Sequence, residues 1–287
     1  MNNFKIFSPL FIFLLCIASL SLPASAQEQI GINAAVKGNV LISSEERAAE
    51  QALVNKPIFL RDQIETAEHS TLQILLKDET TFTVGAKCQM QIDEFVYDPK
   101  KDNNRLTARV NRGVFRFVSG RTSKRSPDNI TLNTPTASLG IRGTMFEAIV
   151  GPEALLCAEK VGAINKSYAI DHNNSTLIVL RGPGGDANTN DRLGRLEVTS
   201  AGETVTLTES GSATLITNRE APPSAPFVIT EQLFGYFNLN LRTEPRGELN
   251  YSPFEIDSRL LFPEIEITYE EGLTPYDPAG ELDIPGG

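Results

Sequence analysis

The chain has 287 residues, of which 36 are acidic and 26 are basic, so its formal net charge at pH 7 is −10. Eleven acidic residues and two arginines lie after residue 243, and the rest of the chain is close to neutral. An acidic chain without a concentrated basic segment is not expected to bind nucleic acid. The length allows one large domain or two small ones, with a substantial hydrophobic core.

The first 26 residues have the features of a secretory signal peptide. Lys5 is their only charged residue, Leu10–Leu22 is apolar, and Ala24-Ser25-Ala26 offers small residues for cleavage. The apolar run is too short to be a convincing membrane-spanning helix. We therefore expect cleavage after Ala26 and a periplasmic or secreted protein that does not span the membrane.

Short segments with apolar side chains at every second position dominate the chain from Ile30 to Thr217. Glycine, Asp, Asn and Lys lie between them, which is typical of strands joined by turns. Two other segments have helical character, Glu45–Val54 and Thr230–Phe237. The pattern predicts an all-β protein with these strands: Val36–Ile42, Leu72–Leu76, Thr80–Val84, Met90–Val96, Leu106–Val110, Val114–Val118, Tyr168–Ile170, Thr176–Leu180, Leu196–Thr199, Thr204–Leu207 and Ala213–Thr217.

Two all-β architectures agree with this strand pattern. Many short strands with small turn residues favour the stacked coils of a β-solenoid. Ser70–Ile74 followed by Thr81–Val84 also resembles Arg195–Val198 followed by Thr204–Leu207, as a weak internal repeat would. The same strand spacing serves a β-sandwich.

Three stretches carry a resemblance to a known family. Gln63-Ile64-Glu65-Thr66 and Leu72–Asp78 precede Gly113-Val114-Phe115-Arg116-Phe117-Val118-Ser119-Gly120, and Thr131–Val150 closes the series. In this order they resemble the FecR domain, an envelope domain named for regulators of iron-citrate uptake. The closing stretch holds the motif residues Thr134, Pro135, Gly140, Arg142, Gly143 and Thr144. The resemblance implies a β-solenoid or β-helix-like arrangement, and a module that has no defined reaction.

The resemblance also sets the expected domain organisation. The regulators that name the family carry a sigma-factor-binding segment and a spanning helix, which the sequence predicts to be missing here. We expect a signal peptide at 1–26, an N-terminal strand and linker at 27–55, the FecR domain at 56–153, a C-terminal β extension at 154–220 and a Pro-containing acidic tail at 221–287.

Arg142 lies in an apolar stretch between Gly140 and Gly143. An unpaired buried charge is very costly, so a buried guanidinium must have hydrogen-bond partners. We expect Arg142 to be buried and to bind backbone and carboxylate groups, and not to present its charge to a ligand.

The turn at Asp78-Glu79 departs from the family, which usually has Asp-Gly there. Glycine accepts a positive φ in a tight turn, whereas Glu does so with strain. We therefore expect a different or slightly strained turn at Glu79.

Signal cleavage would leave two cysteines, Cys88 and Cys157. In an exported chain they can form a disulfide, and the long loop it closes would add roughly 4 kcal/mol of stability in the chain-entropy model. The alternative is two buried thiols that pack as small apolar residues.

The segment Asp186–Glu197 is the sharpest candidate for a ligand site. Asp186, Asn188, Asn190 and Glu197 stand at ligand positions of a calcium loop, although Asp191 replaces the glycine normally required there. The segment follows Gly182-Pro183-Gly184-Gly185 and equally suits a long exposed turn. Calcium is the one cofactor that the sequence suggests.

Groups suited to catalysis are scarce. His69 and His172 lie outside any cluster with metal-ligand spacing, and no nucleophile has an identifiable base nearby. Asp93 and Glu94 could flank a glycosidic bond, but adjacent strand residues point to opposite faces, so we expect them not to converge. The sequence predicts no enzyme activity.

Arginines recur along one segment, at 105, 109, 112, 116 and 121. Arg105 and Arg109 share a strand face, and Gly113 is expected to interrupt the register before Arg116. These arginines form either a basic rim for a glycan, the acidic tail or a partner, or a solvated outer face, which is the expected arrangement.

Together these features predict an exported, non-catalytic FecR-domain module of the bacterial envelope that binds a protein partner through β surfaces and turns. The acidic tail is expected to keep the protein soluble. The alternatives are a glycan- or calcium-dependent ligand-binding protein and an envelope polysaccharide-processing enzyme.

Overall fold

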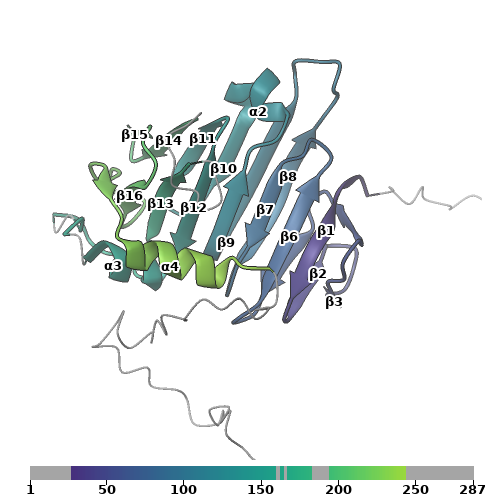
Figure 1. The fold of residues 1–287 in the computed structure, drawn as a ribbon, viewed down its shortest axis with the longest axis horizontal. Helices are drawn as coiled ribbons and strands as arrows, with labels where there is room; N and C mark the ends of the chain where they lie inside the picture. Colours follow the sequence, from purple (N-terminus) through teal and green to yellow (C-terminus); the bar gives the residue numbers. More distant parts are fainter. Residues whose placement is uncertain (1–26, 160–161, 165–166, 183–193, 244–287) are drawn as a thin grey trace, which may run out of the picture.

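The computed structural model describes residues 27–159, 162–164, 167–182 and 194–243. The expected signal peptide and residues 244–287 of the tail lie outside these residues. The described part is mostly β, which confirms the predicted class (Figure 1). Its helices are α2 (Thr122–Arg125), α3 (Pro152–Glu159) and α4 (Glu231–Asn240), with a 3-10 turn at Pro127–Asn129.

The strands pair into two sheets, here called sheet A and sheet B. In order across the sheet, sheet A contains β4 (Pro57–Phe59), β1 (Gln29–Lys37), β6 (Thr71–Leu76), β7 (Thr81–Val84), the second part of β9 (Arg105–Val118), β12 (Met145–Val150), β13 (Thr176–Arg181), β16 (Ser212–Ile216) and β17 (Phe227–Val228). Sheet B contains β3 (Glu50–Gln51), β2 (Val40–Ser43), β5 (Gln63–Thr66), β8 (Gln89–Val96), the first part of β9, β10 (Ile130–Asn133), β11 (Ser138–Arg142), β14 (Arg195–Ser200) and β15 (Glu203–Leu207).

Strand β9 belongs to both sheets and changes sheet at Gly113. Its residues up to Arg112 pair with β8, and those from Gly113 onward pair with β12. Gly113 has a φ of +91°, and a Cβ there would lie 2.3 Å from the Cα of Cys88. Only glycine fits such a crossing, and this confirms the expected break of register at Gly113.

The main hydrophobic core contains side chains from both sheets. Its centre holds four phenylalanines, Phe82, Phe115, Phe117 and Phe146, all fully buried. The Phe117 ring lies 5.1 Å from that of Phe82 and 5.4 Å from that of Phe146, within the usual range for paired aromatic rings. Alternating side chains of β9 and β12 therefore reach this core from sheet A.

Helices α3 and α4 cover the outer face of sheet A over β9, β12, β13 and β16. Val114, Ile149 and Val179 of the sheet pack there with Leu233 and Phe237 of α4 in a second hydrophobic cluster. Figure 1 shows α4 lying across the strands of this sheet. A sheet with apolar residues on both faces needs a cover on each, and the helices provide the outer one.

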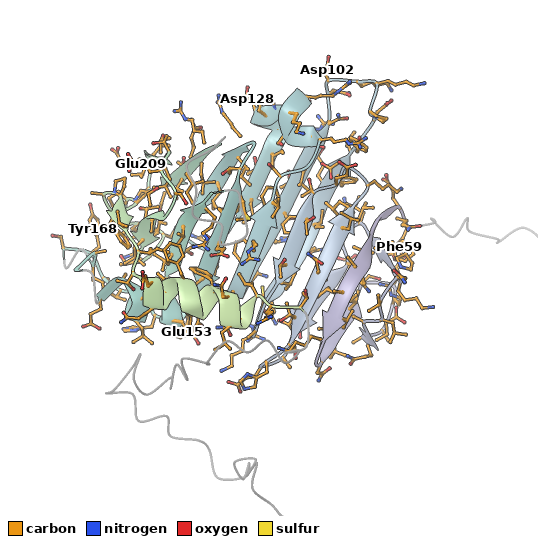
Figure 2. All side chains as sticks on the ribbon, viewed as in Figure 1. Phe59, Asp102, Asp128, Glu153, Tyr168 and Glu209 are labelled. Atoms are coloured by element: carbon orange, nitrogen blue, oxygen red, sulfur yellow. The ribbon has the colours of Figure 1, made fainter. Side chains whose placement is uncertain are left out.

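Helices α3 and α4 lie next to each other, as the position of one residue shows. Glu153 of α3 lies next to α4 in Figure 2. Tyr236 of α4 has a raised pKa, chiefly because it is buried and also because Glu153 and Cys157 are close. Helices α3 and α4 therefore form one continuous cover.

The structure corrects three predicted elements. Val36–Ile42 is not one strand, because β1 ends at Lys37 in sheet A and β2 begins at Val40 in sheet B, with Gly38 at a φ of +72° between them. Glu45–Val54 is not a helix: the amide of Ala52 donates to the carbonyl of Val40, and Glu50 and Gln51 form β3, so sheet pairing overrides the helical tendency. Tyr168–Ile170 is not a strand. Helix α3 was not predicted, whereas the predicted helix at Thr230–Phe237 is confirmed within α4.

Candidate binding surface

The two outer faces of the molecule differ in exposure. Helices α3 and α4 cover the outer face of sheet A over β9, β12, β13 and β16, whereas in the described part of the chain no helix covers sheet B (Figure 1). Strand alternation places polar side chains on this open face: Gln63, Glu65, Gln89, Gln91, Thr107, Arg109, Thr131, Asn133, Ser138, Glu197, Thr204 and Thr206. We call this set the open face.

The open face contains a hollow of about 700 Å³ over β5, β8 and β9. Its polar side chains contact one another across the strands. Gln89 Nε2 donates to Glu65 Oε1 at 2.8 Å, and Gln91 Nε2 donates to the carbonyl of Arg61 at 2.9 Å. Arg109 pairs with Asp93 at 2.7 Å. Amide, carboxylate and guanidinium groups are thus held in a fixed pattern that a partner can hydrogen-bond.

Asp93 and Glu94 lie on the same face, so the prediction that they point to opposite faces is wrong. The pairing of β8 with β9 shifts between Ile92 and Glu94, and Asp93 is the extra residue of this bulge. Both carboxylates reach arginines of β9: Asp93 reaches Arg109, and Glu94 reaches Arg105 at 2.9 Å. These ion pairs occupy the carboxylates.

The arginines of this region do not form an uncompensated basic rim. Arg105 and Arg109 pair with carboxylates of β8, and Arg121 pairs with Glu79. Arg116 lies on the other sheet, because β9 has crossed at Gly113. The predicted solvated face therefore holds for Arg105 and Arg109, which are about half exposed, but not for Arg116.

A buried ion cluster on the outer face of sheet A was not predicted. Glu147 of β12 is fully buried and accepts bonds from Arg116 Nε at 2.8 Å and Nη2 at 2.6 Å. Its other oxygen lies 3.1 Å from Nε of Arg181, which is 1% exposed. The Arg181 guanidinium also stacks on Phe234 of α4, 4.1 Å from the ring centre. Burial lowers the pKa of Arg181, and Glu147 opposes that effect.

Arg142 is not buried, and this corrects the prediction. Its side chain is 46% exposed at the end of β11 and pairs with Asp128 at 2.8 Å. Figure 2 shows Asp128 beside α2, at the edge of the molecule. Its neighbour Ile141 is buried instead and faces the core. The structure does contain a buried arginine with a carboxylate partner, but it is Arg181.

The glycines and threonines of the same motif have structural roles. Gly143 has a φ of +63°, and its carbonyl lies where a Cβ on Gly194 would be, at 2.2 Å. Thr134 Oγ1 accepts from the amide of Ala137 at 3.0 Å and closes the turn that contains Pro135. Thr144 is buried, whereas Gly140 is half-buried on the open face.

Asp78 joins two of the motif stretches, a role that the sequence analysis of the Asp78-Glu79 turn did not predict. It is fully buried and accepts from the Thr80 amide at 3.0 Å, the Thr80 hydroxyl at 2.8 Å and the Thr122 amide at 3.3 Å. The Gly120 amide donates to the Thr80 hydroxyl, and a Cβ on Gly120 would lie 2.2 Å from the Thr80 nitrogen. The expected strain at the adjacent turn is confirmed, because Glu79 has a φ of +68°.

Most residues of the predicted calcium site lie outside the part of the chain that the structure describes. Asp186, Asn188 and Asn190 lie outside the described residues. Glu197 lies on β14 and pairs with Arg195 at 2.8 Å. Among the residues that are described, no group of three or more His, Cys, Asp or Glu side chains could hold a metal ion.

No disulfide joins Cys88 to Cys157, so of the two alternatives the structure has two separate thiols. Cys88 is buried in the main core, whereas Cys157 packs against the cluster beneath α3 and α4. The two thiols therefore belong to different layers. Burial raises the pKa of the Cys88 thiol, which keeps it protonated and unreactive.

A thiol count tests both the cysteines and the signal peptide. Under denaturing, non-reducing conditions, a protein cleaved after Ala26 is expected to show two reactive thiols, from Cys88 and Cys157. Three thiols would mean that Cys16 is retained and cleavage after Ala26 does not occur. A count of zero would show a disulfide and contradict the separate placement of the two cysteines.

None of the described helices is both long and apolar enough to cross a membrane. This finding concerns the helices alone.

Comparison with known proteins gives a family. The family model described as FecR protein matches residues 62–157. Two crystal structures of a candidate anti-sigma factor from Parabacteroides distasonis ATCC 8503 are similar to the chain, each with 14% identity and a TM-score of 0.39, and the similarity covers 59% of this chain and 61% of those chains. No curated protein matches. The matched residues include those of the Asp78 bonds, the β9 crossing and the stretch around Arg142, so this part of the chain, residues 62–157, is similar to the FecR family.

Proposed function

We propose that the protein is an exported, non-catalytic FecR-domain module of the bacterial envelope that takes part in signalling by binding a protein partner through the open face of sheet B. The observation that carries this proposal is the difference between the two faces. The outer face of sheet A lies under α3 and α4 at β9, β12, β13 and β16, and the open face is a broad polar sheet surface within reach of a partner.

The chemistry of the open face favours recognition over reaction. Asp93 pairs with Arg109 and Glu94 pairs with Arg105, so neither of these two carboxylates has the unpaired, apolar surroundings that prepare an acid for catalysis. Fixed amide and hydroxyl groups across several strands suit a protein surface, where polar contacts set orientation and specificity.

We also propose, following the family resemblance, that the two sheets are the walls of one flattened solenoid. The chain crosses between them repeatedly as it advances from β1 to β16. In the described residues β9 and β10 pair in parallel, and the other pairs are antiparallel. A solenoid of this kind offers a long flat wall to a partner.

The proposal is tested by capture of a partner from envelope extract with surface variants. Gln63→Lys and Thr131→Lys place bulky charges on exposed or half-exposed positions of the open face. Both are expected to melt like the parent and to lose a protein that the parent retains. The matched control is Asn238→Lys on the exposed side of α4, which is expected to retain it.

The same variants can also contradict the proposal. If Asn238→Lys loses the captured protein and the open-face variants keep it, the partner binds the helical side. If the protein turns over an envelope polysaccharide, and this activity disappears in Asp93→Asn, the protein is a polysaccharide-processing enzyme and the binding proposal is wrong.

A further inference from the structure

The two sheets end in four edge strands, and three of these edges are protected. Natural proteins protect edge strands because unpaired backbone groups attract other strands. At the N-terminal end, β3 has two residues and β4 has three. At the other end of sheet A, β16 is covered by β17 and by Ser224, whose amide donates to the carbonyl of Leu215 at 2.9 Å and whose hydroxyl accepts from the Leu215 amide. Three prolines in the covering segment, at 222, 223 and 226, block further pairing.

Strand β15 is the exception. It has five residues and pairs along its whole length with β14, from Ser200↔Glu203 to Leu196↔Leu207. Within the described chain its opposite edge pairs with no strand. Its sequence, Glu-Thr-Val-Thr-Leu, contains no proline, glycine or lysine and is rich in residues that favour strands. Apart from the charge of Glu203 at its first position, nothing in β15 discourages addition of another strand.

We propose that β15 pairs antiparallel with β15 of a second copy of this chain, so that sheet B continues across a twofold axis. The sequence of β15 is complementary to itself in this arrangement. With Val205 on the axis, Thr204 lies opposite the partner's Thr206. Cross-strand threonine pairs are favourable, and this strand already forms one, because Thr204 and Thr199 hydroxyls lie 2.8 Å apart.

Charge and burial support the same register. Glu203 is the only charged residue of β15, and it lies opposite the partner's Leu207, so two like charges do not meet. Val205 is half-buried against the main core, and pairing would cover it further. A five-residue strand pair is a small interface, so the expected dimer is weak and depends on concentration. Its consequence is that two open faces join into one continuous surface.

Cysteine cross-linking tests the register directly. In a Cys157→Ser background, Thr204→Cys protein mixed with Thr206→Cys protein is expected to form a disulfide-linked dimer under mild oxidation, because these positions face each other. Either protein alone is expected to cross-link less, because the two copies of its introduced cysteine are diagonal neighbours across the paired strands. The control pair replaces Thr204→Cys with Thr131→Cys, on an interior strand of the same face, and is expected not to cross-link.

Sedimentation over a concentration series gives the second measurement. The parent is expected to shift from monomer to dimer, and Thr204→Lys/Thr206→Lys is expected to remain a monomer with an unchanged melting temperature. Thr131→Lys, which is expected to lose the captured partner, should still dimerise, so failure here and failure of the proposed function are distinguishable. A parent that stays monomeric at every concentration, or equal cross-linking from Thr131→Cys, overturns the dimer.

Discussion

Glu147→Gln is expected to destabilise the domain by about 3–5 kcal/mol, because it leaves the guanidinium groups of Arg116 and Arg181 together on a covered face without their counter-charge. Arg181 is almost fully buried under Phe234 and cannot turn to water. The loss should appear as a lower midpoint in urea unfolding. Because Phe234 belongs to α4, faster proteolysis within α4 should accompany it.

The control is Glu197→Gln on the open face. Glu197 also pairs with an arginine, Arg195, but both side chains are partly exposed, and such pairs contribute little. Its unfolding midpoint should stay close to that of the parent. Equal midpoints for the two variants would show that Glu147 is hydrated in solution, and that α4 does not cover sheet A as described.

Asp78→Ala is expected to lower the free energy of unfolding by roughly 3 kcal/mol or more, because it leaves the Thr80 and Thr122 amides and the Thr80 hydroxyl buried without an acceptor. The bonds of Asp78 hold the β6–β7 turn against the segment after β9, so the loss should also loosen the start of α2. Hydrogen exchange at the Thr122 amide measures this effect locally.

Asp98→Ala serves as the comparison for Asp78. Asp98 also accepts an amide bond in a turn, from Lys100 at 2.9 Å, but it lies in a partly exposed loop where water can replace it. Little change in stability is expected. If Asp78→Ala unfolds at the same denaturant concentration as Asp98→Ala, the buried bonds of Asp78 are not what joins the two motif stretches.

Local patterns in the sequence predicted many strands, most clearly in sheet B, where buried and exposed residues alternate along each strand. The helices show where this reasoning ends. Helix α4 has a Thr230 cap and apolar residues on one side, and it was predicted. Helix α3, Pro-Glu-Ala-Leu-Leu-Cys-Ala-Glu, begins with a proline and continues with strong helix formers, so its signal was present and was missed. The helix predicted at Glu45–Val54 is wrong for the opposite reason, because the pairing of β3 with β2 outweighs the helical propensity of the segment.

The candidate site was less predictable, because its features depend on contacts between distant residues. Arg142 was expected to be the buried arginine from its apolar neighbours alone. Burial depends instead on which sheet face a helix covers, and α4 covers Arg181. The partner of both Arg116 and Arg181 is Glu147, which lies 31 residues after Arg116 in the chain. Similarly, the bulge at Asp93 breaks the alternation that was used to separate it from Glu94.

The central claim is that the partner binds the open face of sheet B and not the helical side. Site-specific photo-cross-linking in living cells tests it most directly, with the probe at Gln63 or Thr131 on the open face and at Gln232 or Asn238 on exposed positions of α4. We expect one discrete adduct, of the same partner, from both open-face positions and none from the α4 positions. Adducts from α4 with none from Gln63 or Thr131 would contradict the claim.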